Sequence, residues 1–134
     1  MKKIICIGNR FVYPDGAALW VYDAVKKETS RKSDMWIEGG LGGLNLITHF
    51  EDTSDILLLD YIKEEKNASF FSLQTVLENT NSKEYTHDSA FYYLLHSLET
   101  LLPSQPNITF LACNPDKEGF IKEVIEHVNI WRGL

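Results

Sequence analysis

The sequence predicts an α/β protein, a three-layer α/β/α sandwich around a twisted, mostly parallel, five-stranded sheet. Short apolar runs, typical of strands buried on both faces, alternate with longer segments in which apolar residues recur at helical spacing. No internal repeat or low-complexity linker divides the chain. Because 134 residues is the usual size of one domain, we expect residues 1–134 to form a single domain.

Three apolar runs in the first half of the chain predict central strands. The expected strands are Ile4–Ile7, Met35–Ile37 and Ile56–Leu59. The first ends at Gly8-Asn9 and the third is closed by Asp60. Between the strands, helical spacing predicts a helix from about Gly16 to Glu28 and a short helix that begins at Leu44 and ends before Asp52. The glycines between the second strand and the short helix predict a tight turn.

The second half is expected to add two strands and two helices. Aromatic residues in Ala68–Thr75 favour a strand near the edge of the sheet. Apolar residues on one face predict a long helix over Phe91–Leu102, stopped by Pro103. Ile108–Cys113 is the last predicted strand. A final helix is indicated by Ile121, Val124, Ile125 and Val128.

Charge and cysteine content exclude several classes of function. The net charge of −6 leaves no basic face for nucleic acid. Cys6 and Cys113 lie in apolar runs, so neither a disulfide framework nor a cysteine-rich metal site is available, which favours a reducing cytoplasm. The apolar stretch after Met1 is too short for a signal peptide, and no segment approaches a membrane span. We therefore expect a cytoplasmic protein without nucleic-acid or membrane partners, and a monomer by default.

Three residues that can ligate a metal fall where ligands bind in such folds, beyond the carboxyl ends of the strands. Asp15 precedes the first helix, where its alternative role is to cap that helix. Asp60 ends an apolar strand, where a carboxylate must be solvated, hydrogen-bonded or metal-bound to avoid a desolvation cost. His87 lies near a helix start, where the helix dipole keeps imidazole neutral; its alternative is a surface histidine.

The commonest signatures of zinc proteases, serine hydrolases and NTPases are absent from the sequence. It contains no His-Glu-x-x-His run, nucleophile elbow or P-loop. His49, His96 and His127 are interpreted as ordinary surface or boundary residues. The glycine cluster at 39–43 leaves a nucleotide-binding module open, because glycine turns before helices can cradle phosphate, but it lacks the dinucleotide spacing. A loop that closely approaches a peptide is the favoured interpretation.

Four motifs, in order, resemble the hydrogenase maturation peptidase family. They are Ile7-Gly8-Asn9 through Pro14-Asp15-Gly16, Glu38-Gly39-Gly40-Leu41-Gly42-Gly43-Leu44, Leu58-Leu59-Asp60, and Thr86-His87. The resemblance implies a phosphorylase/hydrolase-like fold and an endopeptidase that removes the C-terminal extension of a nickel-iron hydrogenase large-subunit precursor after nickel insertion. Nickel would be carried by the precursor and recognised, rather than held permanently. By the same resemblance, Asp15, Asp60 and His87 are the expected catalytic and nickel-reading residues.

The resemblance also implies a peptide-binding role for Asn9, Gly39, Gly40 and Gly42. Two other functions stay open at this point. A non-catalytic nickel-site checkpoint or chaperone would keep the same ligands without proteolysis. In a plain α/β domain, Asp15 and His87 would serve only local structure.

Overall fold

Five strands form one sheet in the computed structural model, which describes residues 2–28, 35–51, 53–79 and 89–133. The strands are β1 (Lys2–Ile7), β2 (Trp36–Gly40), β3 (Asp55–Asp60), β4 (Phe70–Ser72) and β5 (Asn107–Ala112). The helices are α1 (Ala17–Glu28), η2 (Leu44–Leu46), α2 (Ile47–Phe50), α3 (Leu73–Asn79), α4 (Ser89–Leu101) and α5 (Phe120–Arg132).

The strand order is β2-β1-β3-β5-β4, so β3 is the middle strand. The pairs β1–β2, β1–β3 and β3–β5 are parallel, whereas the edge strand β4 runs antiparallel to β5. The predicted five-stranded, mostly parallel sheet is confirmed. The parallel strands all end at one edge of the sheet, which we call the carboxyl edge.

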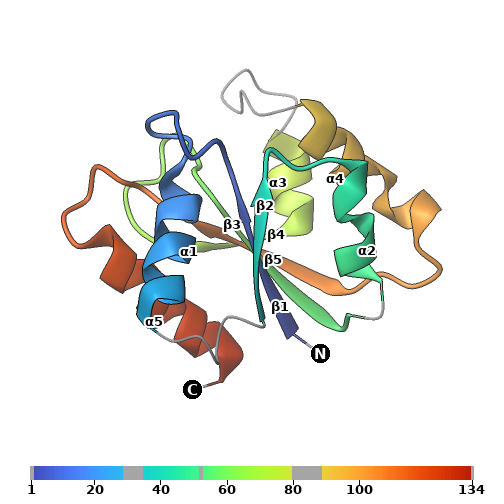
Figure 1. The fold of residues 1–134 in the computed structure, drawn as a ribbon. Coiled ribbons are helices and arrows are strands. Elements are labelled where there is room, and N and C mark those ends of the chain that lie inside the picture. The colour runs from blue at the N-terminus through green and yellow to red at the C-terminus, as the bar shows by residue number, and fades with distance from the viewer. Residues whose placement is uncertain (1, 29–34, 52, 80–88, 134) are drawn as a thin grey trace.

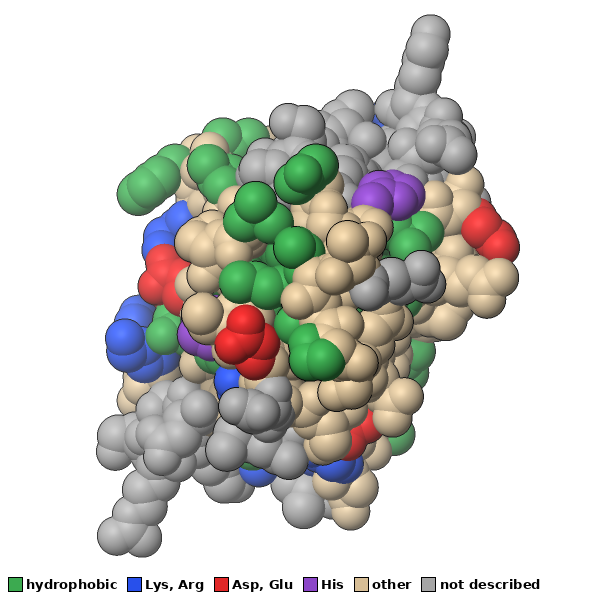
Figure 2. Space-filling model, turned by 90° about the vertical axis from the view of Figure 1, so that its right-hand side faces the viewer, with side chains coloured by type: hydrophobic (Ala, Val, Ile, Leu, Met, Phe, Trp, Pro, Cys, Tyr) green, Lys and Arg blue, Asp and Glu red, His purple; other side chains and the backbone are tan. Residues whose placement is uncertain are grey.

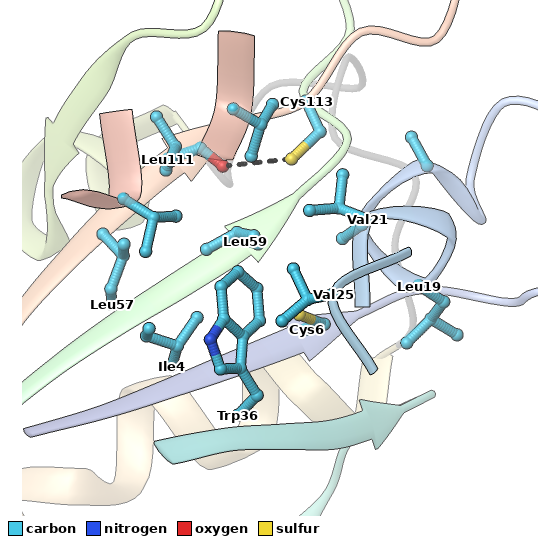
Figure 3. Packing of buried hydrophobic residues seen from close by; sticks show 14 residues of the cluster. Ile4, Cys6, Leu19, Val21, Val25, Trp36, Leu57, Leu59, Leu111 and Cys113 are labelled. Carbon is cyan, nitrogen blue, oxygen red and sulfur yellow. Dashed lines mark hydrogen bonds between the residues drawn. The ribbon is translucent and has the colours of Figure 1, made fainter. Parts of the chain in front are cut away.

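Helices cover both faces of the sheet, which confirms the three predicted layers (Figure 1). α1 and α5 pack on one face with Cys6, Trp36, Leu59 and their neighbours, as Figure 3 shows. α2, α3 and α4 cover the other face, where Ile5, Leu58 and Phe110 are fully buried. Successive residues of β1 and β3 alternate between the two faces. Because both faces are covered, the buried stretches Ile4–Ile7 and Ile56–Leu59 are apolar throughout, and the charged residues of these strands stand at their ends.

The prediction of a strand over Ala68–Thr75 is wrong in its second half. Only Phe70–Ser72 is a strand, and the chain turns into α3 at Leu73. The Ser72 hydroxyl accepts the N–H of Thr75 at 3.1 Å, the side-chain bond that starts a helix. Leu73, Val76 and Leu77 then pack at helical spacing against the core. The aromatic pair Phe70-Phe71 favours a strand, but this cap limits the strand to three residues.

The predicted turn after the second strand is also placed differently. Gly39 and Gly40 belong to β2, so the turn begins one residue before Gly42, whose N–H donates to the Gly39 carbonyl at 3.1 Å. The short helix expected from Leu44 is confirmed as η2 followed by α2. Among the helices of the described ranges, none has the length and apolarity needed to cross a bilayer.

The packing of β3 predicts that shortening a buried side chain lowers the stability of the protein much more than shortening an exposed side chain of the same size. Leu58→Ala should lower the free energy of unfolding by about 2–5 kcal/mol, because Leu58 is 0% exposed and its removal leaves a cavity between the sheet and α4. Ile130→Ala, at a position 63% exposed on α5, should change it by no more than about 0.5 kcal/mol. Urea unfolding of both variants checks this, and equal losses would contradict the described core.

Candidate functional site

The loop after β1 holds Asp15 against the end of that strand. The Asn9 N–H donates to Asp15 Oδ2 at 2.7 Å. A Cβ at Gly8 would lie 2.1 Å from the Asp15 carbonyl oxygen, and one at Gly16 would lie 2.6 Å from the Asn9 carbonyl oxygen. Only glycine permits this approach, so the two ends of the loop lie in direct contact. The Asp15 carboxylate is thereby fixed just beyond the end of β1.

Asp60 is the last residue of the middle strand and is 0% exposed. Its carbonyl oxygen accepts the N–H of Cys113 at 2.9 Å, which continues the pairing of β3 with β5. Leu59 pairs with Cys6, so Asp60 is level with Ile7 on β1. Asp15 and Asp60 therefore lie at the carboxyl edge of neighbouring strands, as the sequence predicts. A fully buried carboxylate in this position carries a desolvation cost that a bound cation would offset.

The third predicted residue, His87, lies outside the described residues. The first described turn of α4 reaches the same edge, because a Cβ at Gly42 would lie 2.8 Å from Phe91 Cδ1. Within the described parts of the chain, no three His, Cys, Asp or Glu side chains gather as a metal site. The structure thus places two of the three predicted ligands at one edge, and the three-residue nickel site stays a prediction.

The glycine loop after β2 is tied to the loop after β1. The Gly8 N–H donates to the Gly40 carbonyl at 2.8 Å. Cys6 pairs with Glu38 and Ile7 with Gly40, so Gly39 is an extra residue that makes a β-bulge. A Cβ at Gly39 would lie 2.7 Å from Ile7 Cδ1 and 2.9 Å from the Cys6 carbonyl oxygen. The bulge brings β2 against β1 at the candidate site.

The four residues predicted to contact a peptide have different surroundings. Gly39 packs on β1 and Gly42 on Phe91, so internal packing accounts for both glycines. Gly40, with a φ of +59°, has open space where a side chain would be. Asn9 organises its own loop, since its Oδ1 accepts the N–H of Phe11 at 3.0 Å. Gly40 is thus the one of the four whose backbone a ligand can approach without displacing packed atoms.

Sequence reasoning missed an arginine that joins three segments near the site. Arg10 donates to Asp23 through Nε at 3.0 Å and Nη2 at 2.8 Å, and Nη1 donates to Glu38 Oε1. These bonds raise the pKa of Arg10, and the bond to Asp23 has a larger effect than the bond to Glu38. The Arg10 carbonyl accepts Trp20 Nε1–H at 3.1 Å. No sequence pattern marks such a contact, because Arg10 and Glu38 are 28 residues apart.

A polar cavity on the other side of Asp60 was also missed. It has a volume of about 560 Å³ and opens between the loops that follow β3 and β5. Tyr61, the residue after Asp60, lines it together with acidic, basic and amide side chains. One wall is fixed, since Lys117 Nζ donates to Asn67 Oδ1 at 2.7 Å and pairs with Glu123. The cavity gives the carboxyl edge room for polar groups beside Asp60.

The two cysteines are not suited to nucleophilic catalysis. Both are buried and free, on the α1 and α5 side of the sheet (Figure 3). Burial is the main cause that raises the pKa of both thiols. The charge of Cys113 raises the pKa of Cys6 further, and the charge of Asp60 raises the pKa of Cys113 further. Because the thiolate is the reactive form, both stay inert thiols near neutral pH. Chemistry at this edge would depend on carboxylates.

The other described histidines lie on different parts of the molecule. The His49 carbonyl accepts Lys3 Nζ–H at 3.2 Å near the start of β1, away from the carboxyl edge. His127 lies on α5, 2.8 Å from the Glu123 carbonyl oxygen through Nδ1. His96 is an exposed residue of α4.

Solved structures with this fold include several hydrogenase maturation peptidases. The hydrogenase maturating endopeptidase HybD from E. coli superposes with a TM-score of 0.75 at 16% identity, covering 98% of this chain and 91% of that one. The [NiFe] hydrogenase maturation protease HybD from Thermococcus kodakarensis gives 0.65 at 19% identity, with 99% and 98% covered. A hydrogenase 2 maturation peptidase from a thaumarchaeote gives 0.62 at 18% identity, with 100% and 99% covered.

No family model matches the sequence, and no curated protein matches it. The resemblance found in the sequence is confirmed as a likeness of fold across nearly the whole chain. At these identities the likeness establishes the architecture, whereas an activity depends on the chemistry of the site.

The contact between Gly8 and Asp15 predicts a different effect for two glycine substitutions. Gly8→Ala should destabilise the protein by about 1–3 kcal/mol more than Gly40→Ala, because its Cβ would overlap the Asp15 carbonyl. Gly40→Ala, with a positive φ but open space, should cost about 1–2 kcal/mol. Thermal and urea unfolding measure the difference, and equal costs would contradict the closed loop.

Proposed function

We propose that this chain is a cytoplasmic endopeptidase that removes the C-terminal extension of a nickel-iron hydrogenase large-subunit precursor after nickel insertion. The observation that carries the proposal is the Asp60 carboxylate, buried at the end of the middle strand and level with the loop that fixes Asp15. The likeness of fold to proteins named as hydrogenase maturation peptidases supports the same activity.

The nickel ion is part of the substrate in this proposal. Two carboxylates and one imidazole suit a borderline divalent ion, and they leave coordination positions for ligands supplied by the precursor. Attraction between a carboxylate and a cation is stronger at a buried position than in water, because the surroundings screen it less. Asp60 would therefore favour a metal-loaded precursor over an empty one.

His87 is proposed as the third residue that meets the nickel. It precedes Ser89, the first residue of α4, by two positions. Two residues span at most roughly 7 Å, and the first described turn of α4 packs on the glycine loop at the carboxyl edge through Phe91. The chain length is thus compatible with a third ligand at the edge that holds Asp15 and Asp60.

The chemistry proposed is hydrolysis by water, without a covalent enzyme intermediate. A water molecule beside the scissile carbonyl transfers a proton to a carboxylate as its oxygen attacks. That carboxyl group then returns the proton to the leaving amine as the C–N bond breaks. The inert thiols of Cys6 and Cys113 support this route. The open space beside Gly40, whose carbonyl already accepts the Gly8 N–H, can admit the peptide, and the cavity beyond Tyr61 can accept polar groups on the other side of Asp60.

The cytoplasmic location rests on the cysteines and on the substrate. Both thiols are unpaired and buried, as expected in a reducing compartment. A precursor that must receive nickel before cleavage would meet its peptidase in the compartment where the metal is inserted.

Charge removal at the two site carboxylates should abolish processing. Asp15→Asn and Asp60→Asn keep the side-chain shape and should each reduce the rate of precursor cleavage by at least about 100-fold, because the carboxylate charge meets the nickel and accepts the proton. The matched control is Asp55→Asn at the opposite end of β3, where the carboxylate accepts a 3.3 Å hydrogen bond from Asn107 Nδ2. Gel shift or mass measurement of the large subunit follows the reaction.

The melting temperature of each variant separates loss of activity from loss of fold. If the Asp60→Asn protein folds and still cleaves the precursor at the normal rate, the role proposed for Asp60 is wrong. Equal losses in Asp55→Asn and Asp60→Asn would show that the position at the carboxyl edge does not matter.

Nickel in the precursor should decide whether cleavage occurs. Incubated with purified protein, nickel-loaded precursor should become shorter by the mass of its C-terminal extension, and nickel-free precursor should not. Binding of the loaded precursor without shortening would instead identify a checkpoint protein that reads the metal. Shortening of both forms would contradict metal reading by Asp15, Asp60 and His87.

A further inference from the structure

Five exposed apolar side chains lie beside the candidate site, and we call them the apolar rim. They are Phe11 (91% exposed), Tyr13 (62%), Leu41 (55%), Leu44 (48%) and Val12 (46%). They come from the loop after β1, from the glycine loop and from the first residue of η2, and the Gly8 to Gly40 hydrogen bond joins the first two segments. Hydrophobic side chains gather at the upper left of the face shown in Figure 2, toward the end at which the parallel strands finish.

The backbone under the rim is fixed by many contacts. The N–H of Val12 donates to the Asn9 carbonyl at 3.0 Å, and the Val12 carbonyl accepts from Gly16 at 2.8 Å. The Tyr13 ring stacks on Trp20, with centroids 6.1 Å apart and planes at 24°. Trp20 in turn donates to the Arg10 carbonyl. These bonds hold the loop in place while leaving its apolar side chains in water.

Apolar side chains on an ordered loop are typical of a binding surface. A contiguous exposed apolar patch costs solubility, and in folded proteins it marks a site of interaction. Aromatic residues supply much of the energy of protein interfaces. Because the loop is already ordered, a partner would not have to offset the entropy of ordering it.

The charge around the rim indicates the chemistry of the partner. The described segments at the carboxyl edge, residues 9–16, 38–46, 60–69 and 113–119, contain seven carboxylates and four cationic side chains. Two of these carboxylates, Asp15 and Glu38, lie in the segments that carry the rim, and the other five follow β3 and β5 or end β3. Arg10, the cation nearest the rim in sequence, is already paired with Asp23 and Glu38. An approaching segment with Lys or Arg beside its apolar residues would be attracted, and an acidic segment would be repelled.

We propose that the apolar rim is the docking surface for the part of the hydrogenase large-subunit precursor that flanks the cleavage site, a segment combining apolar side chains with Lys or Arg. This inference rests on the proposed function and names how the same site selects its substrate. Phe11 and Leu41 project from the two joined loops and anchor the segment, while the open backbone of Gly40 lies next to Leu41 in the chain.

The test uses serine variants and steady-state cleavage of nickel-loaded precursor. Phe11→Ser and Leu41→Ser should each raise KM by about tenfold and leave kcat within about twofold, because the rim binds substrate without touching the reacting atoms. The matched controls are Tyr93→Ser on α4 and Ile130→Ser on α5, which remove side chains 62% and 63% exposed at other places. They should leave KM unchanged.

Direct binding separates failure of this inference from failure of the proposed function. If the unaltered protein cleaves and the rim variants keep their KM, the docking surface is wrong and the peptidase stands. If the unaltered protein binds loaded precursor without cleaving it, and the rim variants bind about tenfold more weakly, the rim stands and the peptidase is wrong. Equal KM increases in rim and control variants would also overturn the inference, since they would show a general loss of fold.

Salt dependence tests the charge of the docked segment. Raising the ionic strength from about 0.05 M to about 0.5 M should weaken binding of the loaded precursor several-fold, because it screens the attraction between basic substrate residues and the acidic edge. Binding that strengthens with salt would contradict a basic segment and indicate a purely apolar contact.

Discussion

The burial of β1 and β3 on both faces is the constraint on which the rest of the structure depends. Ile4–Ile7 and Ile56–Leu59 are at most 1% exposed, and helices pack on them from both sides. Strands of this kind have no room for polar groups along their length, so a functional side chain has to follow the last apolar residue. Asp60 occupies that position on the middle strand, still fully buried, at the edge where loops from four strands meet.

Close contacts at glycines turn this edge into a defined surface. Gly8, Gly16 and Gly39 each occupy a position where a Cβ would overlap backbone or packed side-chain atoms. As a result, the loop after β1 closes on itself and β2 bulges against β1. Such packing limits how far the loops can move, and it fixes the Asp15 carboxylate relative to Asp60 through the strand register.

The sequence contains enough information for the layers, for most of the strands and for the placement of Asp15 and Asp60 at the carboxyl edge. Hydrophobic periodicity and the end of an apolar run are local signals. It does not contain a local signal for features that depend on register or on distant pairing. The Gly39 bulge exists only relative to β1, and the Arg10 contacts join Asp23 and Glu38 from different elements. The strand predicted over Ala68–Thr75 is found at the sheet edge but is shorter for the opposite reason, since the short-range Ser72 cap starts a helix and overrides the β propensity of the neighbouring aromatics.

In the proposed function, Asn9 would link metal reading to substrate docking within one loop. Its backbone N–H binds the Asp15 carboxylate, its side-chain Oδ1 binds the N–H of Phe11, and its carbonyl binds the N–H of Val12. The residue predicted to touch the peptide thus holds both the carboxylate and the base of the apolar rim. In the proposed function the substrate brings the metal, so the enzyme contributes mainly position. Because one asparagine sets the distance between the docked segment and Asp15, binding energy gained at the rim can be used to align the scissile bond.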